Sequence, residues 1–218
     1  MSAPGPARTV SPWNIANALT VVRILLVPVY GALLLAQNGS HVASRFGAFG
    51  VFLLAMFTDR LDGDLARSRG LVTDLGKILD PIADKALLGM AFVGLSLLGT
   101  VSWWITVVVL VREVGITVMR LVVLRHGVLP AGRGGKLKTV LQTIALSLLT
   151  LPLWVFPAAE VWRTVATVVL LAAVVVTVLS GLDYVLQAHR LRSTSPRAQR
   201  KRAERAARDS GAERNSPS

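Results

Sequence analysis

Long blocks of apolar residues alternate with short polar stretches along most of this chain. At 1.5 Å per residue, helices of such length can cross the ~30 Å hydrocarbon core of a bilayer. The polar stretches between them contain Gly, Asn, Ser or Pro, as expected where a chain turns. The pattern predicts an all-α membrane protein with six transmembrane helices, at residues 16–36, 45–67, 74–98, 102–125, 136–156 and 161–187.

The two ends of the chain lack such apolar blocks. Residues 1–11 are polar and rich in Pro and Ala, and they do not have the charged segment, apolar run and cleavage site of a signal peptide. Residues 191–218 are basic and rich in Ala and Ser. We therefore expect a disordered N-terminus at 1–11, a transmembrane domain at 12–190 and a disordered basic tail at 191–218.

Lys and Arg are distributed unevenly among the predicted loops. If the N-terminus is inside the cell, the outer side carries Arg45 and Arg163, whereas the inner loops and the tail carry most of the other basic residues. The positive-inside rule therefore predicts that both termini are cytoplasmic. The same orientation places four aspartates, Asp59, Asp62, Asp80 and Asp84, at the cytoplasmic side. We therefore expect a polar cavity there, set into the inner leaflet and open to the cytoplasm.

Composition narrows the chemistry. The chain is 53% hydrophobic and has no cysteine, which excludes disulfides, thiolate metal ligands and a cysteine nucleophile. Its net charge of +12 would suggest nucleic acid in a soluble protein. The basic tail has no interleaved aromatic residues, so we expect no nucleic-acid partner. In a membrane protein the charge indicates basic cytoplasmic loops near anionic lipid.

Four carboxylates interrupt the apolar pattern. Asp59 and Asp62 are three residues apart, and Asp80 and Asp84 are four apart, so each pair shares one face of a helix. A break at Gly70 and 73–74 would fold the two helices together and bring the carboxylates face to face. Such a cluster repels itself unless cations lie between its members. Oxygen ligands suit Mg²⁺ or Mn²⁺, and two such ions can hold a phosphate.

The alternative is that these carboxylates are solvated on a loop. The segments on either side, 46–57 and 86–98, are almost wholly apolar. Carboxylates at membrane depth are costly and are therefore functional candidates. Asp84 lies one turn deeper than Asp80 and is the best candidate for a general base. Its alternative role is as a structural partner of Lys85 or an arginine.

The pattern D-x2-D-G-x2-A-R-x8-G-x3-D-x3-D is complete in this chain, at Asp59, Asp62, Gly63, Ala66, Arg67, Gly76, Asp80 and Asp84. It resembles the signature of the CDP-alcohol phosphotransferases, over residues 12–190. The resemblance implies two Mg²⁺ or Mn²⁺ ions per site, held by Asp59, Asp62, Asp80 and Asp84, with Asp84 also the base. It implies a homodimer in a bacterial plasma membrane. It further implies that CDP-diacylglycerol contacts Asn17, Thr20, Gly63, Arg67 and Thr73.

Some of these roles also have a physical basis. Gly63 lacks a Cβ, so a nucleotide could approach the backbone, although a helix-packing glycine is an equal alternative. Arg67 lies four residues further on the same face and can pair with a phosphate. Arg23 lies within an apolar block and needs a partner, for which a motif carboxylate is the candidate.

Basic residues further along the chain indicate a second, anionic substrate. Arg112–Glu113 is a charged pair within an apolar block, and it either orders the helix bundle or helps to bind an anion. Arg120, Lys136 and Lys138 flank the cytoplasmic side. Together with Arg112 they could form a pocket for an acceptor phosphate, although each also fits an ordinary basic flank.

The residues around the motif, at 17–23, 79–85, 112–113 and 135–139, resemble those of the bacterial phosphatidylglycerophosphate synthases. That resemblance implies transfer of the phosphatidyl group from CDP-diacylglycerol to glycerol 3-phosphate, with release of CMP. One alternative is a cardiolipin synthase, which uses phosphatidylglycerol as acceptor, and another is an enzyme that uses inositol phosphate. A cation transporter is disfavoured because the outer halves of the spans are nearly continuous Leu, Val and Ala.

Overall fold

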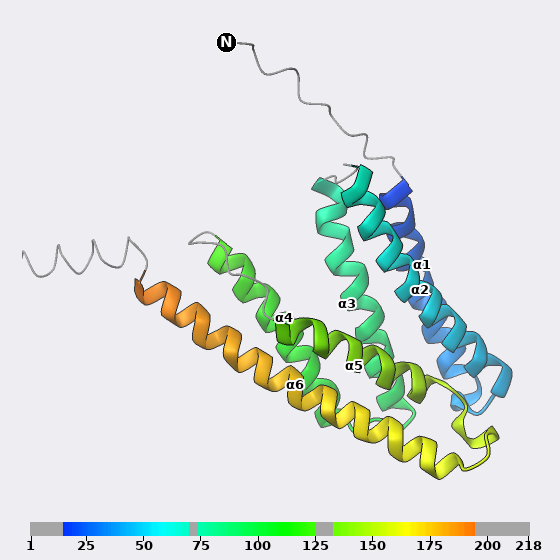
Figure 1. Cartoon of the computed structure of the whole chain (residues 1–218). Helices are drawn as coiled ribbons and strands as arrows, with labels where there is room; N and C mark the ends of the chain where they lie inside the picture. Colours follow the sequence, from blue (N-terminus) through cyan, green and yellow to red (C-terminus); the bar gives the residue numbers. More distant parts are fainter. Residues whose placement is uncertain (1–14, 70–73, 125–132, 195–218) are drawn as a thin grey trace, which may run out of the picture.

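The computed structural model describes residues 15–69, 74–124 and 133–194 (Figure 1). In these ranges the chain forms helices and no strand, so the all-α prediction is confirmed. The α-helices are α1 (Ile15–Leu35), α2 (Val42–Arg69), α3 (Asp74–Leu97), α4 (Trp103–Leu124), α5 (Arg133–Thr150) and α6 (Ala159–Thr194). Two short 3₁₀ turns, η1 (Ala36–Gly39) and η2 (Leu153–Val155), follow α1 and α5.

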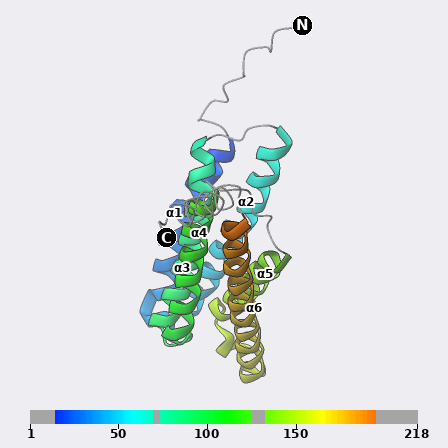
Figure 2. The same ribbon diagram turned by 90° about the vertical axis from the view of Figure 1, so that its left-hand side faces the viewer.

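The helices form two groups that diverge toward one end of the molecule. Helix α1 packs mainly against α2 and α3, and α5 packs mainly against α6, with α4 beside α6. In Figure 1 the beginning of α1, the end of α2 and the beginning of α3 lie together at the top. In the view turned by 90°, α4 overlaps α1 and α3 on the left, and α5 and α6 lie beside each other on the right (Figure 2). Contacts of α3 with α4 and α5 join the groups below the divergence.

Three described segments are long and apolar enough to cross a membrane: Asn17–Gly39, Val42–Asp59 and Ala159–Leu186. A shorter apolar helix covers Leu137–Thr150. Charged residues lie near the beginning of α3, which lowers its hydropathy, because Asp74, Lys77, Asp80, Asp84 and Lys85 fall within its first half. The three spans show a membrane-type chain, while the six-span topology stays a prediction.

Two helices end six or more residues away from their predicted boundaries. Helix α5 ends at Thr150 rather than at 156, because Pro152 has no N–H with which to continue the helical hydrogen bonds. Helix α6 continues to Thr194, beyond the predicted end at 187 and into the segment expected to be tail. Ala, Arg and Leu in this stretch are strong helix formers, which explains the extension.

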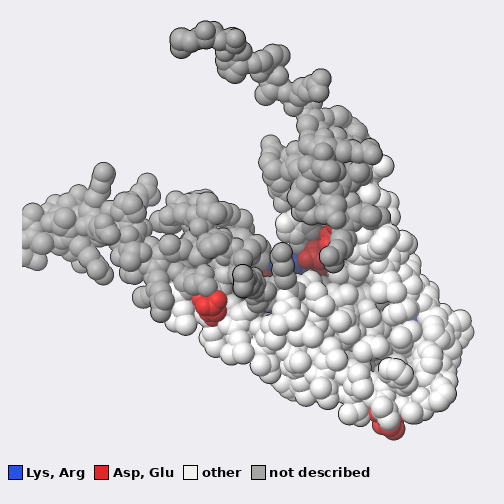
Figure 3. All heavy atoms as spheres, in the orientation of Figure 1, with Lys and Arg blue, Asp and Glu red and all other residues white. Residues whose placement is uncertain are grey.

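A core of large side chains lies where the groups meet. Tyr30, Phe52, Phe92 and Leu146 are all fully buried, and the rings of Tyr30 and Phe52 are 5.5 Å apart. Many other apolar side chains are exposed on all six helices. The described surface in Figure 3 accordingly shows few charged atoms outside the hollow between the groups. Such an extensive apolar surface fits a bilayer rather than water.

Arg45 joins α2 to the end of α5. Its Nε donates a hydrogen bond to the carbonyl of Thr150 at 2.8 Å, and its Nη2 donates to the carbonyl of Leu149 at 2.6 Å. The guanidinium also lies 5.4 Å from the ring centre of Trp154. The last carbonyls of a helix have no partner within the helix, so a buried cation there satisfies them. Arg45 therefore fixes the end of α5 rather than only marking a membrane flank.

Candidate functional site

Arg23 and Asp59 connect α1 to the first carboxylate pair. Arg23 Nη1 lies 2.6 Å from Asp59 Oδ1, and the Arg23 side chain is 1% exposed. A buried guanidinium needs a nearby negative charge because its desolvation is costly. The expectation that Arg23 has a motif carboxylate as partner is confirmed. The contact orients the Asp59 carboxylate from the α1 side.

Asn17 and Thr20 lie on the same inward side of α1 as Arg23. The three residues follow one another at intervals of three, which keeps them on neighbouring positions of one helix face. Both Asn17 and Thr20 are buried. Two of the predicted donor-binding residues are thus placed on the side of α1 that contacts Asp59 through Arg23.

The four motif aspartates lie on helices, as their spacing predicted. Asp59 and Asp62 belong to α2, and Asp80 and Asp84 belong to α3. The side chains of Asp62 and Asp80 are outside the described set. Among the described side chains there is no group of three or more His, Cys, Asp or Glu that could hold a metal. The two-metal site therefore stays a prediction.

The remaining predicted donor contacts are not placed. Gly63 and Arg67 belong to α2, but their surroundings lie outside the described side chains. Thr73 falls between the described ranges. Their contact with a CDP group stays a prediction.

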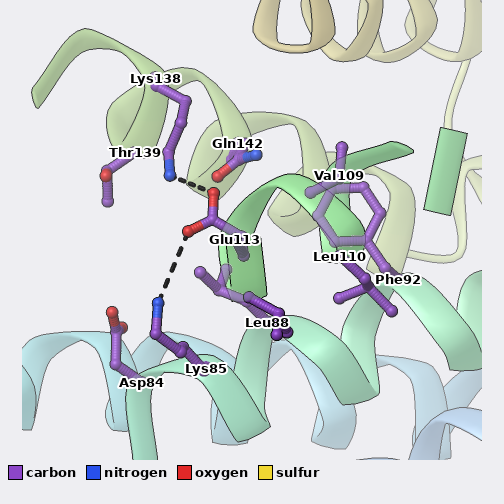
Figure 4. A pocket seen from close by; sticks show the side chains of 11 residues that line it. Asp84, Lys85, Leu88, Phe92, Val109, Leu110, Glu113, Lys138, Thr139 and Gln142 are labelled. Atoms are coloured by element: carbon purple, nitrogen blue, oxygen red, sulfur yellow. Dashed lines mark hydrogen bonds and ion pairs between the residues drawn. The ribbon is translucent and has the colours of Figure 1, made fainter. Parts of the chain in front are cut away.

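A pocket opens beside Asp84, between α3, α4 and α5 (Figure 4). Its cavity volume is about 90 Å³, which is room for about six water molecules. One wall is apolar, formed by Leu88, Phe92, Val109, Leu110 and Val114. The other side is polar, formed by Asp84, Lys85, Glu113, Lys138, Thr139 and Gln142.

Glu113 is the centre of the polar side. Its carboxylate accepts a hydrogen bond from Lys138 Nζ and lies 3.7 Å from Lys85 Nζ (Figure 4). Arg112 Nη1 donates to the same carboxylate at 3.1 Å. Glu113 thus holds three cations, one each from α3, α4 and α5. The internal ion pair at 112–113, which was the alternative to a direct role in anion binding, is present and extends into a cluster. Binding of an acceptor phosphate by Arg112 stays a prediction.

Arg112 does more than pair with its neighbour. Its Nε donates to the carbonyl of Thr177 at 3.2 Å, and its Nη2 donates to Ser180 Oγ at 2.9 Å. These bonds fasten α4 to α6. Of the residues predicted to bind an acceptor phosphate, Lys138 lines the pocket. Arg112 does not line it but forms an ion pair with Glu113, which does. The side chains of Arg120 and Lys136 lie outside the described set, so their roles stay predictions.

Sequence reasoning missed Lys85 and Gln142 as pocket residues. Lys85 follows Asp84 directly, and Gln142 lies one turn after Lys138 on the same face of α5. The four-residue spacing from Lys138 was the available signal for Gln142. For Lys85 the decisive contact, with Glu113 on another helix, is tertiary.

Comparison with known proteins identifies the family of the chain. The chain belongs to the CDP-alcohol phosphatidyltransferase family, whose sequence model matches residues 13–179. The matched region includes both carboxylate pairs and all the residues that line the pocket.

Relatives refine this placement. A Mycobacterium tuberculosis protein named probable phosphatidylglycerophosphate synthase is 48% identical over 177 residues, which cover 81% of this chain and 82% of that protein. A Bacillus subtilis CDP-diacylglycerol–glycerol-3-phosphate 3-phosphatidyltransferase is 37% identical over 183 residues, covering 79% and 93%. The human cardiolipin synthase (CMP-forming) is 36% identical over 134 residues, covering 59% and 42%.

Proposed function

We propose that this protein transfers the phosphatidyl group from CDP-diacylglycerol to glycerol 3-phosphate, producing phosphatidylglycerol phosphate and CMP. The observation that carries the proposal is the 48% identity, across most of both chains, to a protein named probable phosphatidylglycerophosphate synthase. The pocket beside Asp84 supports it, because Lys85 and Lys138 supply the positive charge that a small phosphorylated acceptor needs.

The carboxylates are suitable ligands for divalent cations. Asp59, Asp62, Asp80 and Asp84 offer only oxygen donors, which Mg²⁺ and Mn²⁺ prefer. These four residues would hold the two ions. When bound, the ions supply charge neutralisation for the donor's pyrophosphate. Arg23 keeps Asp59 in position for this role.

The chemistry at Asp84 follows from its place at the edge of the pocket. Its carboxylate accepts the proton of the acceptor's terminal hydroxyl. The hydroxyl oxygen then forms a bond to the phosphorus that carries diacylglycerol, and the bond from that phosphorus to the CMP oxygen breaks. Lys85 and Lys138 hold the acceptor's own phosphate away from the reacting atoms.

The membrane setting supports this reaction. One substrate is a lipid and the other is soluble in water, so the site must be reached from both phases. We infer a six-span protein of a bacterial plasma membrane, with both termini and the pocket on the cytoplasmic side. We also infer a homodimer in which each subunit has its own site, in keeping with the family resemblance.

Cardiolipin synthesis is the second candidate, because the human cardiolipin synthase is also a relative. Its acceptor, phosphatidylglycerol, carries two acyl chains. The described pocket is small and has cations on one side, which favours a compact phosphorylated acceptor. The relatives named phosphatidylglycerophosphate synthase and CDP-diacylglycerol–glycerol-3-phosphate 3-phosphatidyltransferase also cover more of this chain than the cardiolipin synthase does.

The test is CMP release by the purified protein in detergent, with CDP-diacylglycerol and Mg²⁺. Glycerol 3-phosphate, phosphatidylglycerol and inositol phosphate are offered separately. We expect release with glycerol 3-phosphate, reduced at least about 1,000-fold in the Asp84→Asn variant because the general base is lost. The matched control is Asp183→Asn, which removes an exposed carboxylate of α6 and should leave the rate unchanged.

Other outcomes would change the assignment. Release with phosphatidylglycerol alone would favour the cardiolipin reaction. No release with any acceptor, from a protein that is folded, would contradict the proposed transfer. Full activity of Asp84→Asn would show that another group accepts the proton.

A further inference from the structure

The side chain of Gln142 has a hydrogen-bonding atom that the described protein does not use. Gln142 is 1% exposed and lines the pocket beside Lys138. Its carbonyl oxygen Oε1 is buried and has no hydrogen-bond partner among the described residues. A buried amide oxygen without a partner is costly, so such atoms in folded proteins call for an explanation.

Thr177 on α6 determines which way the amide faces. Thr177 Oγ1 donates its single hydrogen to the carbonyl of Ala173 at 2.6 Å. Toward Gln142 it can therefore act only as an acceptor, and it receives the hydrogen bond from Gln142 Nε2 at 3.2 Å. The nitrogen of the amide is thereby held toward α6. The oxygen is left on the side of Glu113 and Lys138, as Figure 4 shows.

The charged groups of the pocket complement this oxygen. Lys85 and Lys138 can only donate hydrogen bonds, so they suit a phosphate but cannot accept the proton of a hydroxyl. The Glu113 carboxylate is already shared among cations. Asp84 is assigned to the reacting hydroxyl. An acceptor with a second hydroxyl would need one further hydrogen-bond acceptor, which Gln142 Oε1 offers.

We propose that Gln142 determines specificity for the acceptor by accepting a hydrogen bond from its non-reacting hydroxyl. The inference rests on the proposed function and deepens it. In glycerol 3-phosphate the terminal hydroxyl reacts and the phosphate meets the lysines, so the central hydroxyl is the one that Gln142 recognises. The central hydroxyl can donate a hydrogen bond to Gln142 Oε1 without breaking the bond between Gln142 Nε2 and Thr177.

The experiment compares two acceptors that differ in one group. Glycerol 3-phosphate and 3-hydroxypropyl phosphate have the same phosphate and terminal hydroxyl, but the second lacks the central hydroxyl. We expect the wild-type kcat/KM to favour glycerol 3-phosphate by about tenfold or more, because sites that bind a hydroxyl reject analogues without it. In Gln142→Leu the activity toward glycerol 3-phosphate should fall and the ratio should approach one.

A second variant tests the role of Thr177. Thr177→Val removes the group that orients the amide and should give a ratio between those of the wild type and Gln142→Leu. Its matched control is Thr164→Val on the same helix. Thr164 makes the same kind of bond, to the carbonyl of Glu160 at 2.8 Å, but is exposed. The control should keep the wild-type ratio.

The outcomes separate this inference from the proposed function. No CMP release with glycerol 3-phosphate would overturn both. Release with a wild-type ratio near one would overturn the role of Gln142 and leave the proposed function intact, whether or not any variant folds. A wild-type ratio retained in folded Gln142→Leu would likewise overturn it.

Discussion

Glu113 shares one carboxylate among Lys85, Arg112 and Lys138, which come from three different helices. Its side chain is 15% exposed and that of Lys138 is 8% exposed. Cations in such a buried cluster depend on Glu113, since its negative charge offsets the cost of their desolvation and their mutual repulsion. Glu113 therefore holds the two lysines at the pocket, because its charge is opposite to theirs.

The Glu113→Gln variant keeps the shape of the side chain but removes its charge. We expect it to lower the free energy of unfolding by about 3 kcal/mol, because buried cations lose their counter-charge. It should also raise the KM for glycerol 3-phosphate more than the KM for CDP-diacylglycerol, since the lysines are no longer held at the pocket. Thermal unfolding in detergent and steady-state kinetics measure the two effects.

The control is Glu160→Gln, which changes an exposed glutamate at the beginning of α6. It should alter the free energy of unfolding by less than about 0.5 kcal/mol. Equal changes in the two KM values of Glu113→Gln would show that Glu113 does not act through the acceptor pocket.

At the scale of elements, α5 is held at both ends by side chains from other helices. Lys138 near its beginning meets Glu113 of α4, and the carbonyls at its end receive hydrogen bonds from Arg45 of α2. Lys138 is the sixth residue of α5 and Thr150 is its last, so the two contacts set the position of the helix across the bundle. Gln142 lies one turn from Lys138 and eight residues before Thr150, so the contact of Lys138 with Glu113 is the one that positions the pocket.

Replacing Arg45 by Met removes hydrogen bonds to the last carbonyls of α5. We expect a loss of about 2–3 kcal/mol in the free energy of unfolding, because hydrogen bonds from a charged donor are among the stronger ones. The kcat/KM should change by less than about threefold, since Arg45 contacts the end of α5 and does not line the pocket. Unfolding by heat in detergent, with CMP release on the folded sample, measures both.

Arg163→Met is the matched control, because Arg163 is exposed on α6. A loss of stability as large in this variant as in Arg45→Met would show that the effect comes from removing an outer charge. The loss of stability in Arg45→Met could then not be assigned to the lost hydrogen bonds at the end of α5.

At the scale of the whole molecule, the number of spans decides on which side of the membrane the chain ends. Three described segments qualify as spans by length and hydropathy. Six spans place the end of α6 on the same side as the N-terminus, whereas three spans would place it on the opposite side. The absence of cysteine from the sequence makes this easy to test.

Single cysteines at positions 37 and 195 are labelled in intact cells with a maleimide that does not cross the membrane. We expect Gln37→Cys, in the turn after α1, to react from outside. Ser195→Cys should react only after the membrane is permeabilised. Labelling of both positions in intact cells would contradict the six-span topology.

Local chemistry explains what was predictable from the sequence. Apolar blocks with intervening turn residues identified the helices, because helix formation and membrane insertion depend mainly on neighbouring residues. The spacing of Asp59, Asp62, Asp80 and Asp84 identified both their helical faces and the family. Arg23 was recognised as needing a carboxylate because a charge in an apolar block cannot remain unpaired.

The sequence by itself thus determined the helical class, the family and the residues of its motif. Tertiary structure alone decided that Lys85, Arg112 and Lys138 meet at Glu113, that Arg45 caps α5 and that Gln142 faces the pocket. The physical reason is distance along the chain. Periodicity and propensity act within a few turns, whereas these contacts join different helices and exist only once the helices have packed.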